Sequence, residues 1–169
     1  MNRKIILHDL EKEAEEMIIA KISEKTTVFA AKPKVHHCVG CFNCWVKTPG
    51  KCAIADRCQK MPKMLAHSDE MIIISRMLYG GYSPEIKAVL DRSIGYIMPY
   101  FRIVKGEMHH AMRYNNPFKL SSYFYGNIED ETECLLAEQL VAANAVNLGA
   151  GSCQVRFCKS AEVIEEVMR

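Results

Sequence analysis

Short apolar runs alternate with amphipathic stretches along the chain. Five of these runs are apolar or β-branched enough to predict buried strands: Lys4–Leu7, Thr26–Ala31, Met71–Ser75, Leu120–Tyr125 and Cys153–Phe157. The stretches between them mostly carry apolar residues at helical spacing. Because strands that alternate with helices form parallel sheets covered on both faces, the pattern predicts a three-layer, doubly wound five-stranded α/β domain over residues 1–169.

The helices are predicted from spacing and from end signals. One helix begins at Glu11, one follows Ser83-Pro84, and others cover Glu129–Val146 and Ala161–Met168. Ser83 is expected to cap its helix, with Pro84 at the first helical position. Two segments lack a period and are predicted as a cysteine-rich loop, residues 36–58, and a polar, irregular excursion, residues 99–117.

Charge and hydropathy exclude several classes of protein. The 169 residues include 22 Lys and Arg against 20 Asp and Glu, a formal net charge of +2. That balance argues against a nucleic-acid partner, which usually requires a basic stripe. No apolar run approaches the length of a membrane span, and acidic residues follow the first strand too closely for a signal-peptide core. We therefore expect a cytoplasmic protein that binds no membrane.

The cysteines supply the first candidate chemistry. Cys38, Cys41, Cys44 and Cys52 have a spacing that cannot place all four on one helix face, so the segment must wrap around something if they converge. Consecutive Cys-x2-Cys steps are typical of iron–sulfur ligands, whereas zinc usually takes two separated pairs. Free thiols in a reducing cytosol are the remaining alternative. Cys134, Cys153 and Cys158 are interpreted as buried small apolar residues.

A second candidate site follows the third strand. In an open parallel sheet, ligands bind at the carboxyl ends of the strands, where we expect the turn after the first strand, the cysteine loop and residues 78–83 to meet. The last of these reads Leu78-Tyr79-Gly80-Gly81-Tyr82-Ser83. Its glycines would let the backbone approach a flat ligand and its tyrosines could stack on one, although an ordinary turn needs glycine as well.

These motifs together resemble a known family. Cys38-Val-Gly-Cys-Phe-Asn-Cys-Trp-Val-Lys-Thr-Pro-Gly-Lys-Cys52, Tyr79-Gly-Gly-Tyr-Ser-Pro84 and Leu90-Asp-Arg92 are similar to motifs of the flavodoxin-like NAD(P)H-dependent FMN reductases, and the cysteine run resembles the iron–sulfur flavoproteins of that superfamily. The resemblance implies a flavodoxin-like oxidoreductase, a homodimer or higher homo-oligomer, that passes electrons from NAD(P)H through FMN to a small-molecule or protein acceptor.

The same resemblance implies site residues. Leu78, Tyr79, Gly80, Gly81, Tyr82 and Ser83 would line the flavin, and a [4Fe–4S] cluster would sit on Cys38, Cys41, Cys44 and Cys52. No catalytic acid or base is expected, because the flavin carries the hydride chemistry. In the polar excursion, a subunit interface is favoured over a lid or a nicotinamide contact through His110 and Arg113.

One motif departs from the family pattern. The turn after the first strand reads Leu7-His8-Asp9-Leu10-Glu11, without the Gly, Ser and Thr residues that hold an FMN phosphate, and its carboxylates would repel one. Asp9 is expected to cap the following helix. Two further hypotheses therefore stand beside the FMN reductase: a flavin-free binding or assembly subunit, and a protein that transfers electrons through the cluster alone.

Overall fold

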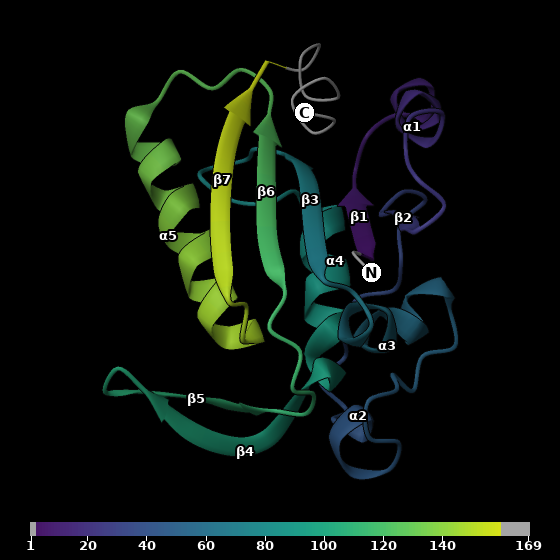
Figure 1. The fold of residues 1–169 in the computed structure, drawn as a ribbon, viewed down its shortest axis with the longest axis vertical. Coiled ribbons are helices and arrows are strands. Elements are labelled where there is room, and N and C mark those ends of the chain that lie inside the picture. The colour runs from purple at the N-terminus through teal and green to yellow at the C-terminus, as the bar shows by residue number, and fades with distance from the viewer. Residues whose placement is uncertain (1–2, 160–169) are drawn as a thin grey trace.

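The computed structural model describes residues 3–159, and all five predicted strands lie within it. They are β1 (Lys4–His8), β2 (Thr26–Ala30), β3 (Glu70–Arg76), β6 (Lys119–Tyr125) and β7 (Ser152–Cys158). These strands pair in parallel in the order β2-β1-β3-β6-β7 (Figure 1). The strand order reverses between β1 and β3, as in other doubly wound sheets. The predicted fold class is confirmed.

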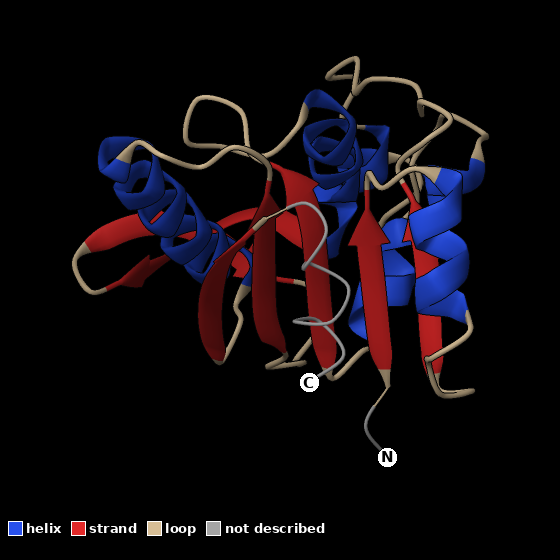
Figure 2. Cartoon of the chain, turned by 90° about the horizontal axis from the view of Figure 1, so that it is seen from above, coloured by secondary structure: helices blue, strands red, loops and turns tan. Residues whose placement is uncertain are grey.

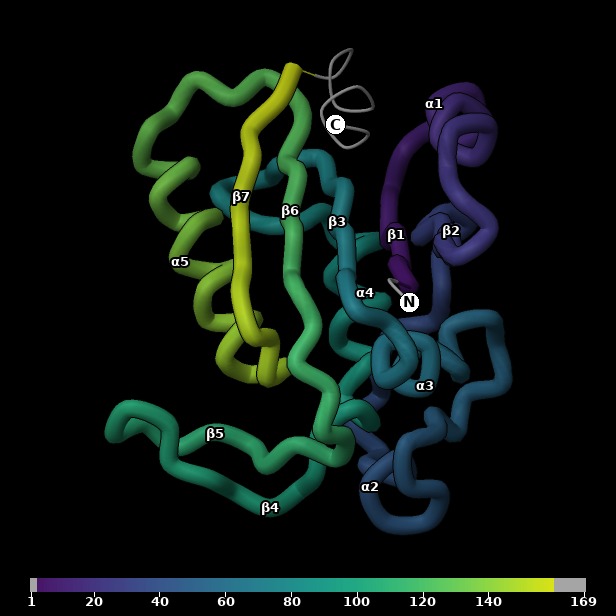
Figure 3. The backbone as a smooth tube through the Cα atoms, in the orientation of Figure 1, coloured from purple at the N-terminus to yellow at the C-terminus, as the bar shows by residue number. Residues whose placement is uncertain are grey.

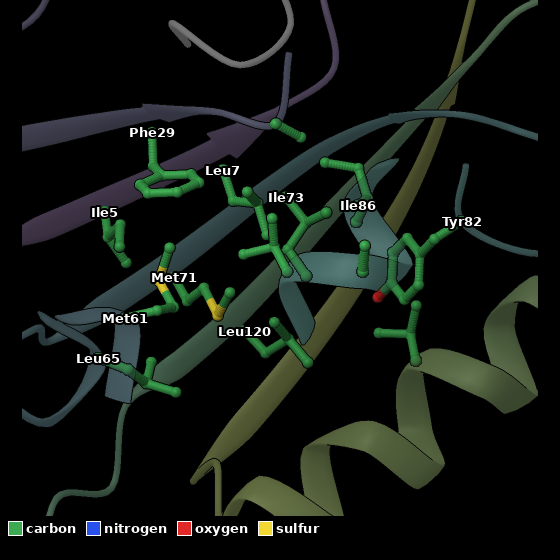
Figure 4. Close-up of a cluster of buried hydrophobic side chains, with 14 of the residues drawn as sticks. Ile5, Leu7, Phe29, Met61, Leu65, Met71, Ile73, Tyr82, Ile86 and Leu120 are labelled. Atoms are coloured by element: carbon green, nitrogen blue, oxygen red, sulfur yellow. The ribbon is translucent and has the colours of Figure 1, made fainter. Parts of the chain in front are cut away.

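Helices cover both faces of this sheet (Figure 2). Ile18 of α1 (Lys12–Ile19) packs on one face, together with Ile6 and Ile72. The other face buries the larger core against α3 (Met61–Ala66), α4 (Pro84–Arg92) and α5 (Glu131–Leu148). Figure 4 shows part of that core. The predicted helix Ala161–Met168 lies outside the described residues.

Local end signals explain where α4 begins. The Ser83 hydroxyl oxygen accepts a hydrogen bond from the Ile86 N–H at 3.4 Å, and Pro84 occupies the first turn. The Ser83 N–H in turn donates to the Ser75 Oγ at 2.9 Å, which ties the start of α4 to β3. The predicted cap is therefore confirmed.

The prediction for residues 99–117 as an irregular excursion is wrong. Most of the segment forms an antiparallel hairpin of β4 (Ile97–Val104) and β5 (Glu107–Met112), which extends from one end of the sheet (Figure 3). Its turn is Lys105-Gly106, with both φ angles positive at 51° and 87°. Such two-residue turns match the natural twist of a hairpin. The strand pattern was missed because histidines and arginines interrupt the alternation of apolar residues such as Phe101 and Ile103. Both of these side chains are exposed. The expected homodimer stays a prediction.

The cysteine-rich segment also has more structure than a loop. It contains the short helix α2 (Asn43–Val46) and leads into the 3-10 turn η1 (Arg57–Lys60) and then α3. Together these elements form the crossover from the carboxyl end of β2 to the amino end of β3. Within residues 3–159, no helix is both long and apolar enough to cross a membrane.

Candidate functional site

The four cysteines of the motif gather around one cavity. Its lining includes Cys38, Cys41, Cys44 and Cys52, and the apolar side chains of Phe42, Ile54 and Ile94 lie between them. Cys44 is buried and Cys52 is half-buried, whereas Cys38 and Cys41 are exposed. The cavity therefore has a deep side against the protein and an open side toward solvent.

Backbone geometry lets this short segment wrap around the cavity. Gly40 and Phe42 both have positive φ angles, 64° and 53°. A left-handed residue between successive cysteines turns the chain tightly, and alternating bends of this kind form the concave nests found at many iron–sulfur sites. Nothing lies within 4 Å of a Cβ added at Gly40, so its glycine serves the backbone angle rather than close packing. These turns let all four cysteines face the same cavity, which their spacing would prevent on one face of a helix.

Arg92, at the end of α4, holds the segment in place. Its side chain has no exposed surface. The Nε–H donates to the Cys52 Sγ at 3.1 Å, and the two terminal nitrogens donate to the carbonyl oxygens of His36 and Ile54 and to both carboxylate oxygens of Asp56. These contacts use all five guanidinium donors, and every acceptor belongs to residues 36–56. One buried cation therefore organises the whole cysteine segment.

Burial and the neighbouring thiols affect the charge state of Cys44. Burial raises the pKa of the Cys44 thiol, and the nearby Cys52, Cys38 and Cys41 raise it further. The raised pKa favours the neutral Cys44 thiol, and a coordinating metal would have to displace its proton. The hydrogen bond from Arg92 lowers the pKa of Asp56, so the buried ion pair remains charged at neutral pH.

Trp45 fastens the outer part of the segment. Its Nε1–H donates to the Ile94 carbonyl oxygen at 3.0 Å, and its ring lies 5.0 Å from the His110 ring and 5.2 Å from the Phe42 ring. Trp45 therefore anchors the segment both to the chain after α4 and to the hairpin. Arg113 donates to the Gly95 and Ile97 carbonyl oxygens, so its guanidinium is already engaged by the protein.

The four cysteines of this cavity are not arranged around one metal ion. Among the described residues, no three His, Cys, Asp or Glu side chains converge closely enough to hold one metal ion. A tetrahedral zinc site needs four ligand atoms at about 2.0–2.3 Å from one centre. Iron–sulfur clusters are held by four cysteine thiolates, and four cysteines line this cavity. The donor set of four thiols fits that group.

The cysteines and residues 78–83 do not meet, which corrects the expected arrangement. Residues 77–83 follow the carboxyl end of β3 and precede α4, whereas Arg92 at the far end of α4 contacts Cys52. Figure 1 shows α2 at the end of the molecule opposite the arrowheads of β6 and β7. The nine residues of α4 separate the two sites by about 14 Å of helix rise.

Residues 78–83 form a closed turn with one exposed aromatic ring, that of Tyr79. Leu78 and Gly81 exchange two backbone hydrogen bonds, with Tyr79 and Gly80 at the corner. A Cβ at Gly80 would lie 3.0 Å from the Glu133 carbonyl oxygen, so this glycine permits close contact with α5. Tyr79 is 91% exposed. The role of these residues in binding a flavin stays a prediction.

The second tyrosine of this loop points into the core. The Tyr82 ring stacks on Phe124 at 5.1 Å, and its hydroxyl lies 2.9 Å from the Ser122 Oγ. Burial raises the pKa of Tyr82 to about 12. Ser83 is also buried, as the cap of α4. Tyr82 therefore stabilises the sheet–helix packing, and Tyr79 is the loop's solvent-facing ring.

Asp9 is not the helix cap that its position suggested. The N-cap of α1 is Glu11, and the Asp9 carboxylate instead accepts hydrogen bonds from the Arg76 N–H at 3.1 Å and the Tyr125 hydroxyl at 2.9 Å. It is buried where β1, β3 and β6 end. The Asp9 carboxylate thus occupies the Arg76 N–H at this edge of the sheet. Two more acidic residues, Glu11 and Glu13, lie at the start of α1. These residues do not fit an FMN phosphate.

Sequence reasoning missed the two residues that organise the cysteine cavity. Asp56 and Arg92 are 36 positions apart, and neither stands out by composition. The one signal was positional: Arg92 ends the Leu-Asp-Arg motif, and Asp56 follows shortly after the last cysteine of the motif. Only the path of the crossover shows that these residues pair.

Comparisons with known proteins agree with the fold. No family model matches the chain. An iron–sulfur flavoprotein of Methanocaldococcus jannaschii is 32% identical over 84 residues, which cover 50% of this chain and 42% of that protein. The match therefore spans less than half of that relative's length.

Solved structures match over nearly the whole chain. The NAD(P)H:quinone oxidoreductase from Methanothermobacter marburgensis aligns with a TM-score of 0.62 and 12% identity, covering 99% of this chain and 90% of that one. An FMN-dependent NADH-azoreductase from Bacillus anthracis, in complex with FMN, aligns with a TM-score of 0.55 and 11% identity over 99% and 94%. The chain therefore has the flavodoxin-like fold of FMN reductases and azoreductases, with partial sequence similarity to iron–sulfur flavoproteins.

Proposed function

We propose that this chain is a redox protein that transfers electrons through an iron–sulfur cluster held by Cys38, Cys41, Cys44 and Cys52. The observation that carries the proposal is the placement of all four cysteines around one cavity whose deep wall is the buried Arg92. The partial similarity to a protein named an iron–sulfur flavoprotein supports the same assignment.

Each part of the cavity has a defined role in this proposal. When bound, an iron–sulfur cluster accepts and releases single electrons. The Arg92 Nε–H withdraws electron density from the Cys52 sulfur, which favours the reduced state, because hydrogen bonds to the sulfurs and nearby positive charge raise a cluster's reduction potential. Phe42 and Ile94 limit access of water from the sides. The exposed Cys38 and Cys41 leave one side open to a small-molecule or protein electron acceptor.

The proposal is tested by purifying the protein without oxygen and assaying iron, acid-labile sulfide and visible absorbance on one sample. We expect iron and sulfide in equal amounts, with a broad brown absorbance that bleaches on addition of dithionite. A preparation that stays colourless after reconstitution with ferrous iron and sulfide, and still has its motif thiols free, contradicts the proposal. Stoichiometric zinc without sulfide contradicts it as well.

The NAD(P)H-dependent FMN reductase activity implied by the resemblance requires FMN, and we expect the natural chain to bind FMN poorly. The buried Asp9 carboxylate already takes the Arg76 N–H, and a phosphate dianion beside it would be repelled. Added FMN should therefore keep the fluorescence of the free flavin. Replacing Asp9-Leu10-Glu11 by Gly-Ser-Thr should increase FMN affinity by at least about tenfold, since one removed repulsion or one gained charged hydrogen bond contributes more than 1.4 kcal/mol.

The outcome of that titration decides between two functions. If the natural chain retains FMN through gel filtration, the flavin-dependent oxidoreductase becomes the better assignment and Asp9 must move on binding. If neither chain binds FMN, the ring site at residues 78–83 is absent too. The control is Glu16→Ser on the exposed side of α1, which removes a carboxylate without altering the turn.

A further inference from the structure

A second cavity, of about 970 Å³, opens at the amino ends of β1 and β2. It borders the cysteine segment, because Pro49, Gly50 and Lys51 of that segment form part of its wall, and it shares no lining residue with the cysteine cavity. The remaining wall comes mainly from the starts of β1 and β2, from η1 and α3, and from Tyr114 after the hairpin. Ligands of flavodoxin-like sheets bind at the carboxyl ends of the strands, so this cavity is a separate place.

Its lining is strongly basic. Six lining residues are cations and one is a carboxylate, Glu24; the cations are Arg3, Lys4, Lys25, Lys51, Lys60 and Lys63. The whole chain has a formal net charge of only +2, so the rest of the molecule is net negative. Four separate segments thus bring positive charge to one concave surface. A charged cleft of this kind concentrates ligands of the opposite sign.

Most of these cations have no acidic partner. Lys4 pairs with Glu70 at 3.0 Å, but within the described residues no carboxylate pairs with the side chains of Arg3, Lys25, Lys51, Lys60 and Lys63. Lysines elsewhere, such as Lys12, Lys32 and Lys87, form ion pairs. Clustered like charges without counterions are unfavourable, so an anion that binds between them relieves repulsion.

The helical part of the wall combines basic and apolar side chains on one face. The cavity is lined by residues at the spacing of one helix face, from η1 through α3 to its C-cap: Lys60, Lys63, Met64 and His67. Met64, Pro49 and the half-buried ring of Tyr114 add apolar surface next to the ammonium groups. The cavity volume lies in the range of small-molecule sites, roughly 300–1,000 Å³.

We propose that this cavity binds a small molecule that carries two or more phosphate groups on an aromatic or apolar body, as nucleotides do. Lysine ammonium groups contact phosphate oxygens as point charges, and the apolar wall accommodates the body. Binding here needs neither the cluster nor a flavin, so it goes beyond electron transfer. Because Pro49, Gly50 and Lys51 belong to the cysteine segment, the ligand would lie directly beside the redox site.

Isothermal titration of the 169-residue chain with ATP and with inorganic tripolyphosphate tests the proposal. We expect ATP to bind more tightly than tripolyphosphate, and more weakly as salt is raised. Lys60→Gln/Lys63→Gln should weaken ATP binding by at least about tenfold, because each charged hydrogen bond contributes roughly 1.5–3 kcal/mol. The matched control is Lys21→Gln/Lys34→Gln, which removes two exposed lysines outside the cavity wall and should bind ATP like the natural chain.

Three results would overturn this assignment. ATP that does not bind excludes the site outright. Equal affinity for ATP and tripolyphosphate would show that the basic surface attracts polyanions by charge and does not contact the nucleoside part of ATP. Equal loss in the two double variants shows that total charge, rather than the cavity, governs binding. All four lysines are exposed and have no carboxylate partner in the described structure, so thermal unfolding should confirm that both variants fold.

Discussion

Replacing Cys41 by serine is expected to abolish the brown absorbance and the bound sulfide of anaerobically purified protein. A cubane cluster needs four thiolates, and a serine hydroxyl ligates iron poorly at this position because it must lose a proton first. Cys41 is the informative choice, since it is exposed and lines the open side of the cavity. Its loss therefore removes a ligand without leaving a hole in the core.

The matched control for that variant is Cys153→Ser. The prediction that Cys134 and Cys153 are buried is wrong, because Cys134 is half-buried and Cys153 is exposed. Cys153 is therefore an exposed thiol like Cys41, but it lies on β7 and does not line the cavity. It should retain iron, sulfide and colour in full. If Cys41→Ser and Cys153→Ser keep the same amount of iron and sulfide, the motif does not hold a cluster and the proposed electron transfer fails.

Much of the fold could be predicted from the sequence because its strands are locally distinctive. The predicted strand Met71–Ser75 has four consecutive apolar residues, as is typical of a strand buried on both faces, and it lies within the central strand β3. The cysteine spacing likewise predicted wrapping, and the structure places all four cysteines around one cavity. Both features follow from composition within a few residues.

The location of the site could not be predicted in this way. A parallel crossover must return the chain from the carboxyl end of one strand to the amino end of the next. Residues 36–58 lie within that crossover, so their order along the chain leaves either end of the sheet open to them. The buried Arg92, 40 residues beyond Cys52, decides where they lie. Partners so distant in sequence leave no periodic signal.

Asp9 shows a subtler limit. The sequence is enough to show that the turn after β1 lacks the residues of a phosphate site. It also predicts that the Asp9 carboxylate accepts hydrogen bonds, but it favours a helix cap as their source because a helix follows. The helix begins two residues later than a cap at Asp9 would require, and the acceptor serves β3 and β6 instead. Side chains at a sheet edge can bond to neighbouring strands, which only the strand order reveals.

Breaking the Arg92–Asp56 pair should be the most destabilising single change at the site. Arg92→Met keeps similar bulk but leaves the Asp56 carboxylate, only 17% exposed, without its cation. Loss of one partner from a buried pair costs about 3–5 kcal/mol. Urea unfolding of the reduced, metal-free protein measures this without interference from a cluster. The control, Lys87→Met, breaks an exposed pair on the same helix and should cost less than about 0.5 kcal/mol.

A second substitution and the pH dependence separate charge from packing. Asp56→Asn removes the stranded charge, so the double variant should recover part of the stability lost in Arg92→Met. Because Arg92 lowers the pKa of Asp56, the ion pair stabilises the fold above the ordinary pKa of 3.8 and loses that effect as pH falls below it. The deficit of Arg92→Met should therefore shrink below pH 3.8. A deficit that persists unchanged in acid and in the double variant would assign Arg92 a packing role alone, and the Cys52 hydrogen bond would then be incidental to it.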